Sequence, residues 1–278
     1  MIHAPTYWSM QTLIKQFIAG KDASVLTDIS EQDYRKALGL SQSSLKDFLT
    51  SPAHYLSATE EVQEPTKAMQ VGTAFHALML QDNPLAFYAI KKKMDGRTKD
   101  GKEYNERFAV ENVGKAIIDS EDEETIQRMR ESILRHPLAR ELISKITHKE
   151  LAIFGTTKDG NVRLKGRLDA YCEEDGFIID FKSAEDASPE GFKKAIFDRR
   201  YDLQNIQYPW LINNAGKKFT KFYFIACEKK PPYAVGVYSI SENWLTYTAD
   251  IWAKAVYRYS DCQKSGVYPA YSDEEVVL

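Results

Sequence analysis

The sequence contains few cysteines and no closely spaced pair of them. Cys172, Cys227 and Cys262 are an odd, widely separated set. Such a set argues against a disulfide framework, and it supplies too few thiolates for a four-cysteine zinc site or iron–sulfur cluster. Free cysteine behaves as a small apolar residue. We therefore expect all three side chains to be buried.

Long apolar runs are also absent. No window reaches the roughly 18 apolar residues that a membrane span requires. Residues 1–20 lack the basic start, apolar stretch and small-residue cleavage site of a secretory leader. We expect no membrane contact and a cytoplasmic location.

Neither sign of charge is in large excess: 37 Lys and Arg residues stand against 40 Asp and Glu residues, a net charge of −3. The whole-chain balance therefore gives no sign of a nucleic-acid partner, which only a local patch could contact. No internal repeat or low-complexity tract occurs, which excludes solenoids and propellers. At 278 residues with 43% hydrophobic content, the chain is expected to form one globular domain over residues 1–278.

Apolar spacing predicts that residues 1–145 are mainly helical. One helix is expected to begin near Ser43 and to contain Pro52 in its far end. Another begins with Ser120 as N-cap and Glu123 three residues later, a capping box. Its apolar face consists of Ile126, Met129 and Ile133.

From residue 146 to 278 the pattern changes to strands. Alternating runs over 150–157, 161–172 and 176–183, with turns at 158–160 and 173–176, predict three antiparallel strands. A helix over 201–216, strands over 219–227 and 233–241, and a helix ending near Gly266 follow. The expected fold class is α/β: a mixed central sheet flanked by helices, with a helical N-terminal portion.

Charged residues stand on these strands where apolar ones are usual. Alternation puts Asp180 and Lys182 on the face of strand 176–183 opposite Phe181. The hairpin turn would bring Asp169 on the preceding strand close to Asp180. Two facing carboxylates repel each other and need positive charge nearby. One lysine neutralises only one of the two negative charges, whereas a divalent cation neutralises both. The alternative without a function is a solvated Asp180–Lys182 ion pair on an exposed sheet face.

Mg²⁺ is the natural candidate for that cation because it prefers oxygen ligands and keeps several waters; Mn²⁺ is expected to substitute. Asp169, Asp180, a further carboxylate such as Glu150, and a backbone carbonyl, for which we take Phe181, would form an incomplete shell. Lys182 could orient or deprotonate the attacking water while the metal stabilises charge on phosphate oxygens. That chemistry is phosphodiester hydrolysis.

The stretches "LKGRLDAY" and "IIDFKS" resemble the core of the PD-(D/E)XK nuclease superfamily. The resemblance implies that Asp169 is the first metal carboxylate and that Asp180, Phe181 and Lys182 form the (D/E)xK element. The proline of the superfamily name is absent; Leu168 stands before Asp169. Many members lack it too.

Three more elements resemble the RecB-like branch. "QNIQY" matches its QxxxY element, which makes Gln204 and Tyr208 site residues one helical turn apart. "GTAFHALML" resembles a helix that supplies a histidine, which implies His76 as an extra metal ligand, and Glu150 matches the preceding glutamate. Each has a plain alternative: an ordinary helix surface, a satisfied core histidine, and a strand-end surface charge.

Over residues 40–265 the chain is most similar to the RecE-type, exonuclease VIII-like group of phage and prophage exonucleases. The resemblance implies a 5′-to-3′ exonuclease that degrades one strand of linear double-stranded DNA without ATP in a bacterial host cell. It also implies a homo-oligomeric ring, trimer or tetramer, and a single-strand annealing protein as partner. Two alternatives stay open: another RecB or CRISPR-associated nuclease, and an inert DNA-binding or assembly module.

Two basic clusters are candidates for contacts with DNA phosphates. They consist of Lys91, Lys92, Lys93, Arg97, Lys99 and Lys102, and of Lys193, Lys194, Arg199 and Arg200. Solvated surface charge is the alternative for both. Gly96, Gly101 and Lys102 fit G-x-x-x-x-G-K, but Glu103 replaces the required Ser or Thr and no strand-loop-helix context is evident. We expect a mobile loop there, not a nucleotide site, and assign no role to residues 1–40 or the acidic tail 272–278.

Overall fold

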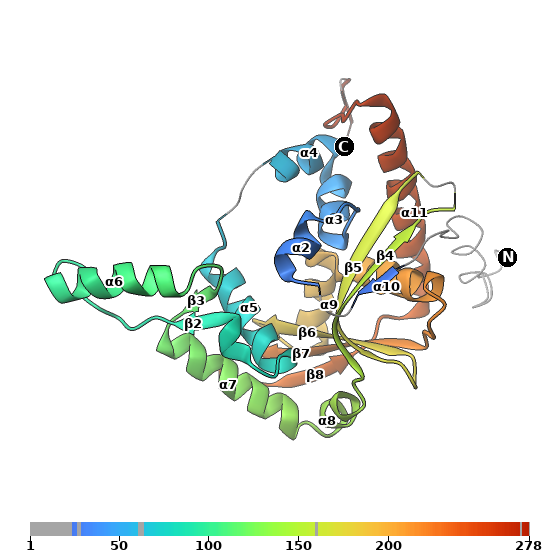
Figure 1. Cartoon of the computed structure of the whole chain (residues 1–278). Coiled ribbons are helices and arrows are strands. Elements are labelled where there is room, and N and C mark those ends of the chain that lie inside the picture. The colour runs from blue at the N-terminus through green and yellow to red at the C-terminus, as the bar shows by residue number, and fades with distance from the viewer. Residues whose placement is uncertain (1–23, 27–28, 61–63, 159–160, 273, 278) are drawn as a thin grey trace.

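A computed structural model describes residues 24–26, 29–60, 64–158, 161–272 and 274–277 of the chain (Figure 1). Its centre is a six-stranded sheet in the order β1-β4-β5-β6-β7-β8. The strands are β1 (Ser24–Leu26), β4 (His148–Thr156), β5 (Arg163–Cys172), β6 (Phe177–Ala184), β7 (Lys221–Glu228) and β8 (Val235–Tyr238). Only the β6–β7 pair is parallel among these. The predicted α/β class with a mixed sheet is confirmed.

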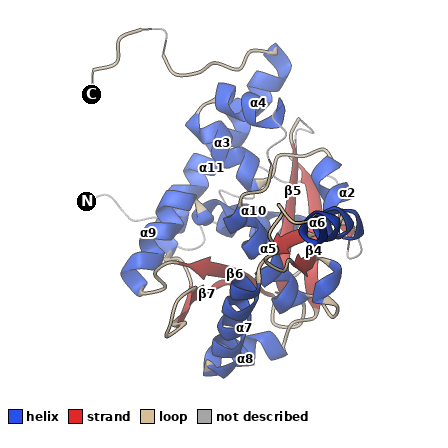
Figure 2. Ribbon diagram, turned by 90° about the vertical axis from the view of Figure 1, so that its left-hand side faces the viewer, coloured by secondary structure: helices blue, strands red, loops and turns tan. Residues whose placement is uncertain are grey.

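Helices cover both faces of the sheet (Figures 1 and 2). One face carries the core that includes Leu164, Ile178 and Trp210; its helices are α3 (Gln42–Thr50), α9 (Pro189–Arg199), α10 (Tyr201–Asn214) and α11 (Glu242–Ser265). The other carries a second core with α5 (Lys67–Leu80), α7 (Ser120–Arg135) and α8 (Pro137–Ser144). The three cysteines are free and buried, as predicted.

A projecting arm extends from the second face (Figure 1). It consists of the parallel pair β2 (Tyr88–Ile90) and β3 (Ala116–Ile118), a 3-10 turn at Pro84–Ala86, and α6 (Lys99–Glu111). The remaining helices are the short α2 (Glu31–Lys36) and α4 (Pro52–Glu60). No helix among the described residues is long and apolar enough to cross a membrane.

Several local predictions need correction. Pro52 starts α4 instead of lying inside one long helix, because proline is tolerated in the first turn and breaks a helix interior. The cap of α7 is Asp119, with Asp122 completing the capping box, one residue before the predicted pair. Residues 159–160 of the predicted turn at 158–160 lie outside the described residues. Prediction missed β1, β2, β3 and α9 and expected a loop where α6 begins.

The strands and helices predicted between residues 146 and 278 are present. Strands β4, β5 and β6 are antiparallel neighbours. Helix α11 ends at Gly266, whose φ of 71° is the left-handed value that glycine adopts freely. The apolar face of α7 is buried, with Ile126, Met129 and Ile133 in the second core.

Candidate active site

The site is built where β5 and β6 stop pairing. Their antiparallel ladder ends with Ala170 opposite Ile179, and the next residue on each strand is a carboxylate, Asp169 and Asp180. The Phe181 N–H, which has no β5 backbone partner beyond the ladder, donates to Asp169 Oδ2 at 2.8 Å. The fork between the strands therefore brings both aspartates to one place, as the hairpin prediction required.

Asp180 and Lys182 form an ion pair inside the protein, not on a solvated face. The side chains are 3% and 13% exposed. Burial raises the pKa of Asp180 to about 6, against the lowering influence of Lys182. Burial also acts to lower the pKa of Lys182, but Asp180 and Asp169 outweigh it and raise that pKa. The solvated ion-pair alternative is therefore wrong.

Lys182 has a third neighbour in α10. Its Nζ lies 4.5 Å from the centroid of the Tyr201 ring, a cation–π arrangement. Asp180 Oδ2 touches Lys182 Nζ, yet no well-aligned hydrogen bond reaches that oxygen from the described part of the chain. A buried carboxylate oxygen without such a donor favours an additional positive charge nearby.

His76 approaches the fork from α5. Its Nδ1 lies 3.3 Å from Asp169 Oδ2. Burial acts to lower the pKa of His76, but the Asp169 carboxylate outweighs it and raises that pKa. Burial also opposes the ionised form of Asp169, but His76 and the other donors keep its pKa below the usual value. The predicted histidine therefore contacts the first predicted metal carboxylate.

Glu150 stands opposite Asp169 on β4, because the flanking cross-strand pairs are Lys149 with Ala170 and Leu151 with Leu168. Its φ of 48° is unusual for a residue other than glycine. Burial raises its pKa, and Arg167 opposes that rise. It lies inside β4 and does not open the strand, since β4 begins at His148.

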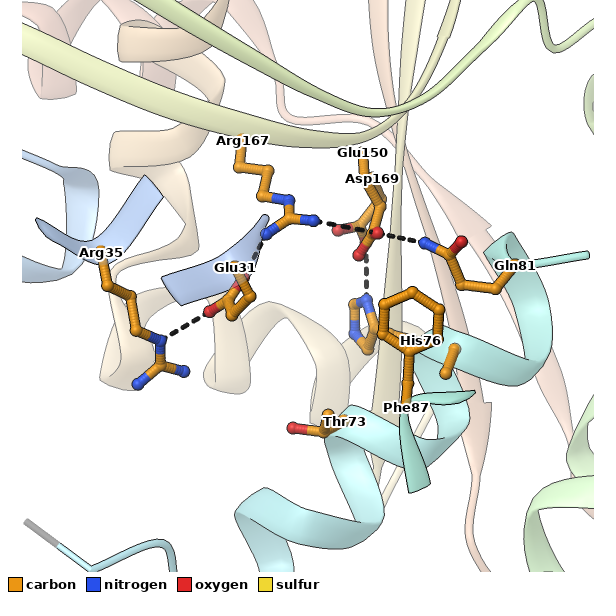
Figure 3. A pocket seen from close by; sticks show the side chains of 10 residues that line it. Glu31, Arg35, Thr73, His76, Gln81, Phe87, Glu150, Arg167 and Asp169 are labelled. Carbon is orange, nitrogen blue, oxygen red and sulfur yellow. Dashed lines mark hydrogen bonds and ion pairs between the residues drawn. The ribbon is translucent and has the colours of Figure 1, made fainter. Parts of the chain in front are cut away.

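A pocket of about 250 Å³ opens above these residues (Figure 3). Its lining comes from four parts of the chain: α2, α5 with the segment that follows it, β4 and β5. The lining residues are Glu31, Arg35, Thr73, His76, Ala77, Gln81, Phe87, Glu150, Arg167 and Asp169. Asp180 and Lys182 are not among them. Three predicted site residues, His76, Glu150 and Asp169, therefore line the pocket. Asp180 and Lys182 lie deeper in the protein, next to Asp169.

Prediction assigned no site role to the residues of α2. Lys165 anchors this helix by donating from Nζ to the carbonyl oxygens of Tyr34, Arg35 and Ala37, at 3.0, 3.1 and 2.7 Å. Carbonyls at the end of a helix lack intrahelical donors, and a lysine satisfies them well. The period-two run "RLKGRLD" indicated that Lys165 and Arg167 share a face with Asp169, but nothing in the sequence indicated which helix covers that face.

Gln204 and Tyr208 lie on α10, which is buried along nearly its whole length. Gln204 Nε2 donates to Tyr208 Oη at 3.4 Å. Burial raises the pKa of Tyr208 well above its ordinary value, and Asp180 adds to that rise. Tyr208 packs on Gly166 of β5, where an added Cβ would lie 2.8 Å from the ring. The alternative of an ordinary helix surface is therefore wrong for this pair.

The described residues hold no ready-made cluster of three or more His, Cys, Asp or Glu side chains that could bind a metal. Glu150 is instead turned to Arg167 Nη2, at 3.0 Å, and to Gln81. Asp169 is turned to His76. The carboxylates are neighbours, but their oxygens are engaged by other side chains.

Both basic clusters lie largely on the surface. Lys91, Lys92, Lys93, Arg97, Lys99 and Lys102 are exposed on the loop after β2 and the start of α6. Lys193, Lys194 and Arg199 are exposed on α9, whereas Arg200 is half-buried and pairs with Asp202 at 3.0 Å. Lys99 and Lys194 pair within their helices with Glu103 and Asp198.

The G-x-x-x-x-G-K stretch does lie between a strand and a helix, β2 and α6, contrary to the prediction. The loop is nevertheless closed by its own chain. The Gly101 N–H donates to Thr98 Oγ1 at 3.1 Å, and an added Cβ at Gly101 would lie 2.0 Å from the Asp95 carbonyl oxygen. The backbone there caps α6 and leaves no cradle for a phosphate.

Comparison with known proteins gives a family and a fold. The family model described as "PDDEXK-like domain of unknown function (DUF3799)" matches residues 41–276. No curated protein matches the sequence. Among solved structures, the "Putative exonuclease" from Eubacterium rectale, determined at 2.19 Å, is similar in fold with a TM-score of 0.59 and 14% sequence identity. The match covers 86% of this chain and 87% of that one.

Proposed function

The chain belongs to the PDDEXK-like domain family, and on that premise we propose that it is a metal-dependent nuclease that hydrolyses phosphodiester bonds of DNA. The observation that carries the proposal is the fork between β5 and β6. It gathers Asp169, Asp180 and Lys182 beneath an open pocket. Asp180 and Lys182 of the (D/E)xK element form a buried ion pair. A purely structural ion pair would not need Asp169 as a second, mostly buried carboxylate beside it, because an extra buried charge is costly.

The donor set fits Mg²⁺ or Mn²⁺. Asp169, Asp180 and Glu150 supply hard oxygen ligands, and the buried Asp180 Oδ2 receives no well-aligned hydrogen bond from the described residues. A cluster of three ligands is not required, because Mg²⁺ often uses one or two protein carboxylates with water and substrate phosphate. His76 and the Phe181 carbonyl are further candidate ligands. Bound there, the metal would polarise a phosphoryl oxygen and lower the pKa of a water molecule.

The protein's own groups have separate roles in this proposal. Lys182, held by Asp180 and the Tyr201 ring, orients the attacking water. Gln204 and Tyr208 keep α10 packed against β5 at Gly166. This packing fixes the position of β5, the strand that carries Asp169, relative to α10. His76 holds Asp169 from the pocket side.

The finer proposal is a 5′-to-3′ exonuclease that acts on ends of linear double-stranded DNA without ATP. It includes a homo-oligomeric ring and a single-strand annealing protein as partner in recombination. What supports it is the sequence resemblance to RecE-type exonucleases. The exposed lysines and arginines of the loop 91–98, α6 and α9 are proposed to contact DNA phosphates.

The test is degradation of linear duplex DNA labelled at the 5′ or the 3′ end, compared with a closed circle, with Mg²⁺ or chelator and no ATP. Asp180→Ala and Lys182→Ala should each abolish cleavage. Asp250→Ala and Lys254→Ala are matched controls, because they break an exposed 2.7 Å Asp–Lys pair on α11.

The exonuclease proposal expects metal-dependent loss of the 5′ label from linear DNA alone, in wild type and controls. Cleavage of the circle would instead favour another RecB or CRISPR-associated type of nuclease. DNA binding without any cleavage would favour the inert module.

A further inference from the structure

Glu31, the first residue of α2, is held between two arginines. Arg35 Nε lies 2.6 Å from Glu31 Oε1, and Arg167 Nη1 contacts Glu31 Oε2. All three side chains line the pocket above the strand fork (Figure 3). Two guanidinium groups that converge on one carboxylate form an arrangement that suits any oxyanion of similar charge, because Arg pairs with carboxylates and phosphates by the same parallel N–H···O bonds.

Arg167 depends on anions more than Arg35 does. The Arg167 side chain is 14% exposed, whereas that of Arg35 is 69% exposed. Arg167 also donates to Glu150 Oε2, at 3.0 Å, while its buried Nε has no acceptor in the described part of the chain. A nearly buried guanidinium is costly without an anionic partner, and Arg167 lines the pocket, so a partner that replaces Glu31 can reach it from there.

Glu31 is a replaceable anion. Its side chain is 52% exposed. Helix α2 is anchored at its other end, by the Lys165 bonds to three carbonyls and by the Leu40 N–H bond to the Arg163 carbonyl at 2.8 Å. The glutamate can therefore rotate away without detaching the helix.

We propose that Arg35 and Arg167 form a subsite for a phosphate of the nucleic-acid strand, and that Glu31 fills this subsite in the free protein. The inference rests on the proposed function. DNA binding then replaces one oxyanion with another, so the guanidinium pair is never left without a partner. Glu31 sets how strongly a phosphate must bind to enter the pocket, because the competent state is the fraction with Glu31 displaced.

The experiment measures binding of a fluorescent DNA duplex by anisotropy in chelator, so that the readout does not depend on cleavage. Glu31→Gln removes the competing charge and should bind DNA about 5- to 10-fold more tightly. Asp33→Asn is the matched control on the same helix, since Asp33 contacts Ser30 and neither arginine. It should change affinity less than about 2-fold.

Arg35→Gln and Arg167→Gln should each weaken binding about 10-fold and reduce the dependence of log affinity on log salt by about one ion. In the Arg167→Gln background, Glu31→Gln should no longer raise the affinity for DNA. This non-additive effect is expected if Glu31 and Arg167 act in one subsite. Circular dichroism and thermal melting confirm that each variant is folded. Duplexes with a 5′-phosphate, a 5′-hydroxyl or no ends distinguish a terminal phosphate from an internal one.

Equal affinities for Glu31→Gln and Asp33→Asn would overturn the subsite, as would a gain that persists without Arg167. Either result leaves the nuclease proposal intact if wild type still cleaves DNA. Failure of folded wild-type protein to bind or cleave any DNA would reject the proposed function itself, and the subsite with it.

Discussion

The two sides of the carboxylate site differ in how their charges are satisfied. On the inner side, which we define as Asp180, Lys182, Gln204 and Tyr208, the side chains of β6 and α10 are mostly buried. On the outer side, defined as Glu31, Arg35, His76, Glu150 and Arg167, the side chains line an open pocket. The inner partners are fixed by packing, whereas the outer partners can exchange with solvent, ions and ligands.

This difference shows how one site can combine precise geometry with replaceable partners. A charge buried on the inner side must find its counter-charge within the fold or raise its free energy. The exposed charges of the outer side, Glu31 and Arg35, are screened and lose less when a partner leaves. Four changes test whether the two sides are really so unlike.

The largest effect is expected at Asp180. Asp180→Asn should lower the rate of DNA cleavage at least about 1000-fold, because metal-ion catalysis contributes several kcal/mol. The metal-free protein should also lose stability, since the substitution leaves the buried Lys182 ammonium without its main counter-charge. Cleavage assays and thermal melting in chelator check both parts. Asp198→Asn, on the exposed face of α9, should change neither, and an unchanged melting temperature for Asp180→Asn would contradict the view of the inner side.

Packing on the inner side is tested at Gly166. An added Cβ would lie 2.8 Å from Tyr208 Cδ1 and 2.9 Å from Leu211 Cδ1. Gly166→Ala should therefore destabilise the protein by about 2–3 kcal/mol, the cost of overpacking. Denaturant unfolding measures this.

Gly72→Ala is the control for that substitution, because nothing lies within 4 Å of its added Cβ on α5. It should leave stability unchanged or raise it by about 0.5–1 kcal/mol through helix propensity. Equal effects at both glycines would show that the inner packing is loose.

The inner side was largely predictable from sequence, whereas on the outer side only His76 and Glu150 were predicted, from the resemblance to the RecB-like branch. Asp169, Asp180 and Lys182 follow from strand periodicity and a short hairpin, both of which are local. The QxxxY pair likewise lies within one helix. Glu31 and Arg35 reach the pocket only because Lys165 binds the end of α2 across more than a hundred residues of chain. No periodicity encodes such a contact, and the positive φ of Glu150 has no sequence signal either.

The anchor of the outer side is tested by Lys165→Met. The substitution leaves three carbonyl oxygens at the end of α2 without their donor. Global stability should fall by about 1–2 kcal/mol. Hydrogen exchange should increase in α2 more than in α10, and Lys46→Met on α3 serves as the control. Unchanged protection of α2 would show that other contacts hold it.

The last prediction concerns pH and the same buried aspartate. Burial raises the pKa of Asp180 to about 6 from an ordinary value of 3.8. The folded metal-free protein therefore holds this proton more tightly than the unfolded chain, so stability falls as pH rises from about 4 to 6 and then levels off. A shift of this size corresponds to about 3 kcal/mol. Asp180→Asn should lack it in unfolding curves measured in chelator, and an identical pH profile would refute the assignment.

The bond from the Phe181 N–H to Asp169 Oδ2 gives an amide two residues beyond the last β5–β6 pair a side-chain acceptor on β5 in place of a main-chain one. The Asp169 side chain therefore extends the pairing of β5 with β6 by one hydrogen bond, in addition to being a candidate ligand. Substitution of Asp169 removes this bond between the strands together with the carboxylate, whereas substitution of Asp180 removes a carboxylate and its ion pair with Lys182. The exchange rate of the Phe181 amide consequently reports whether Asp169 Oδ2 accepts this bond or is bound by a ligand instead. A spectroscopist could therefore follow the site through one backbone resonance.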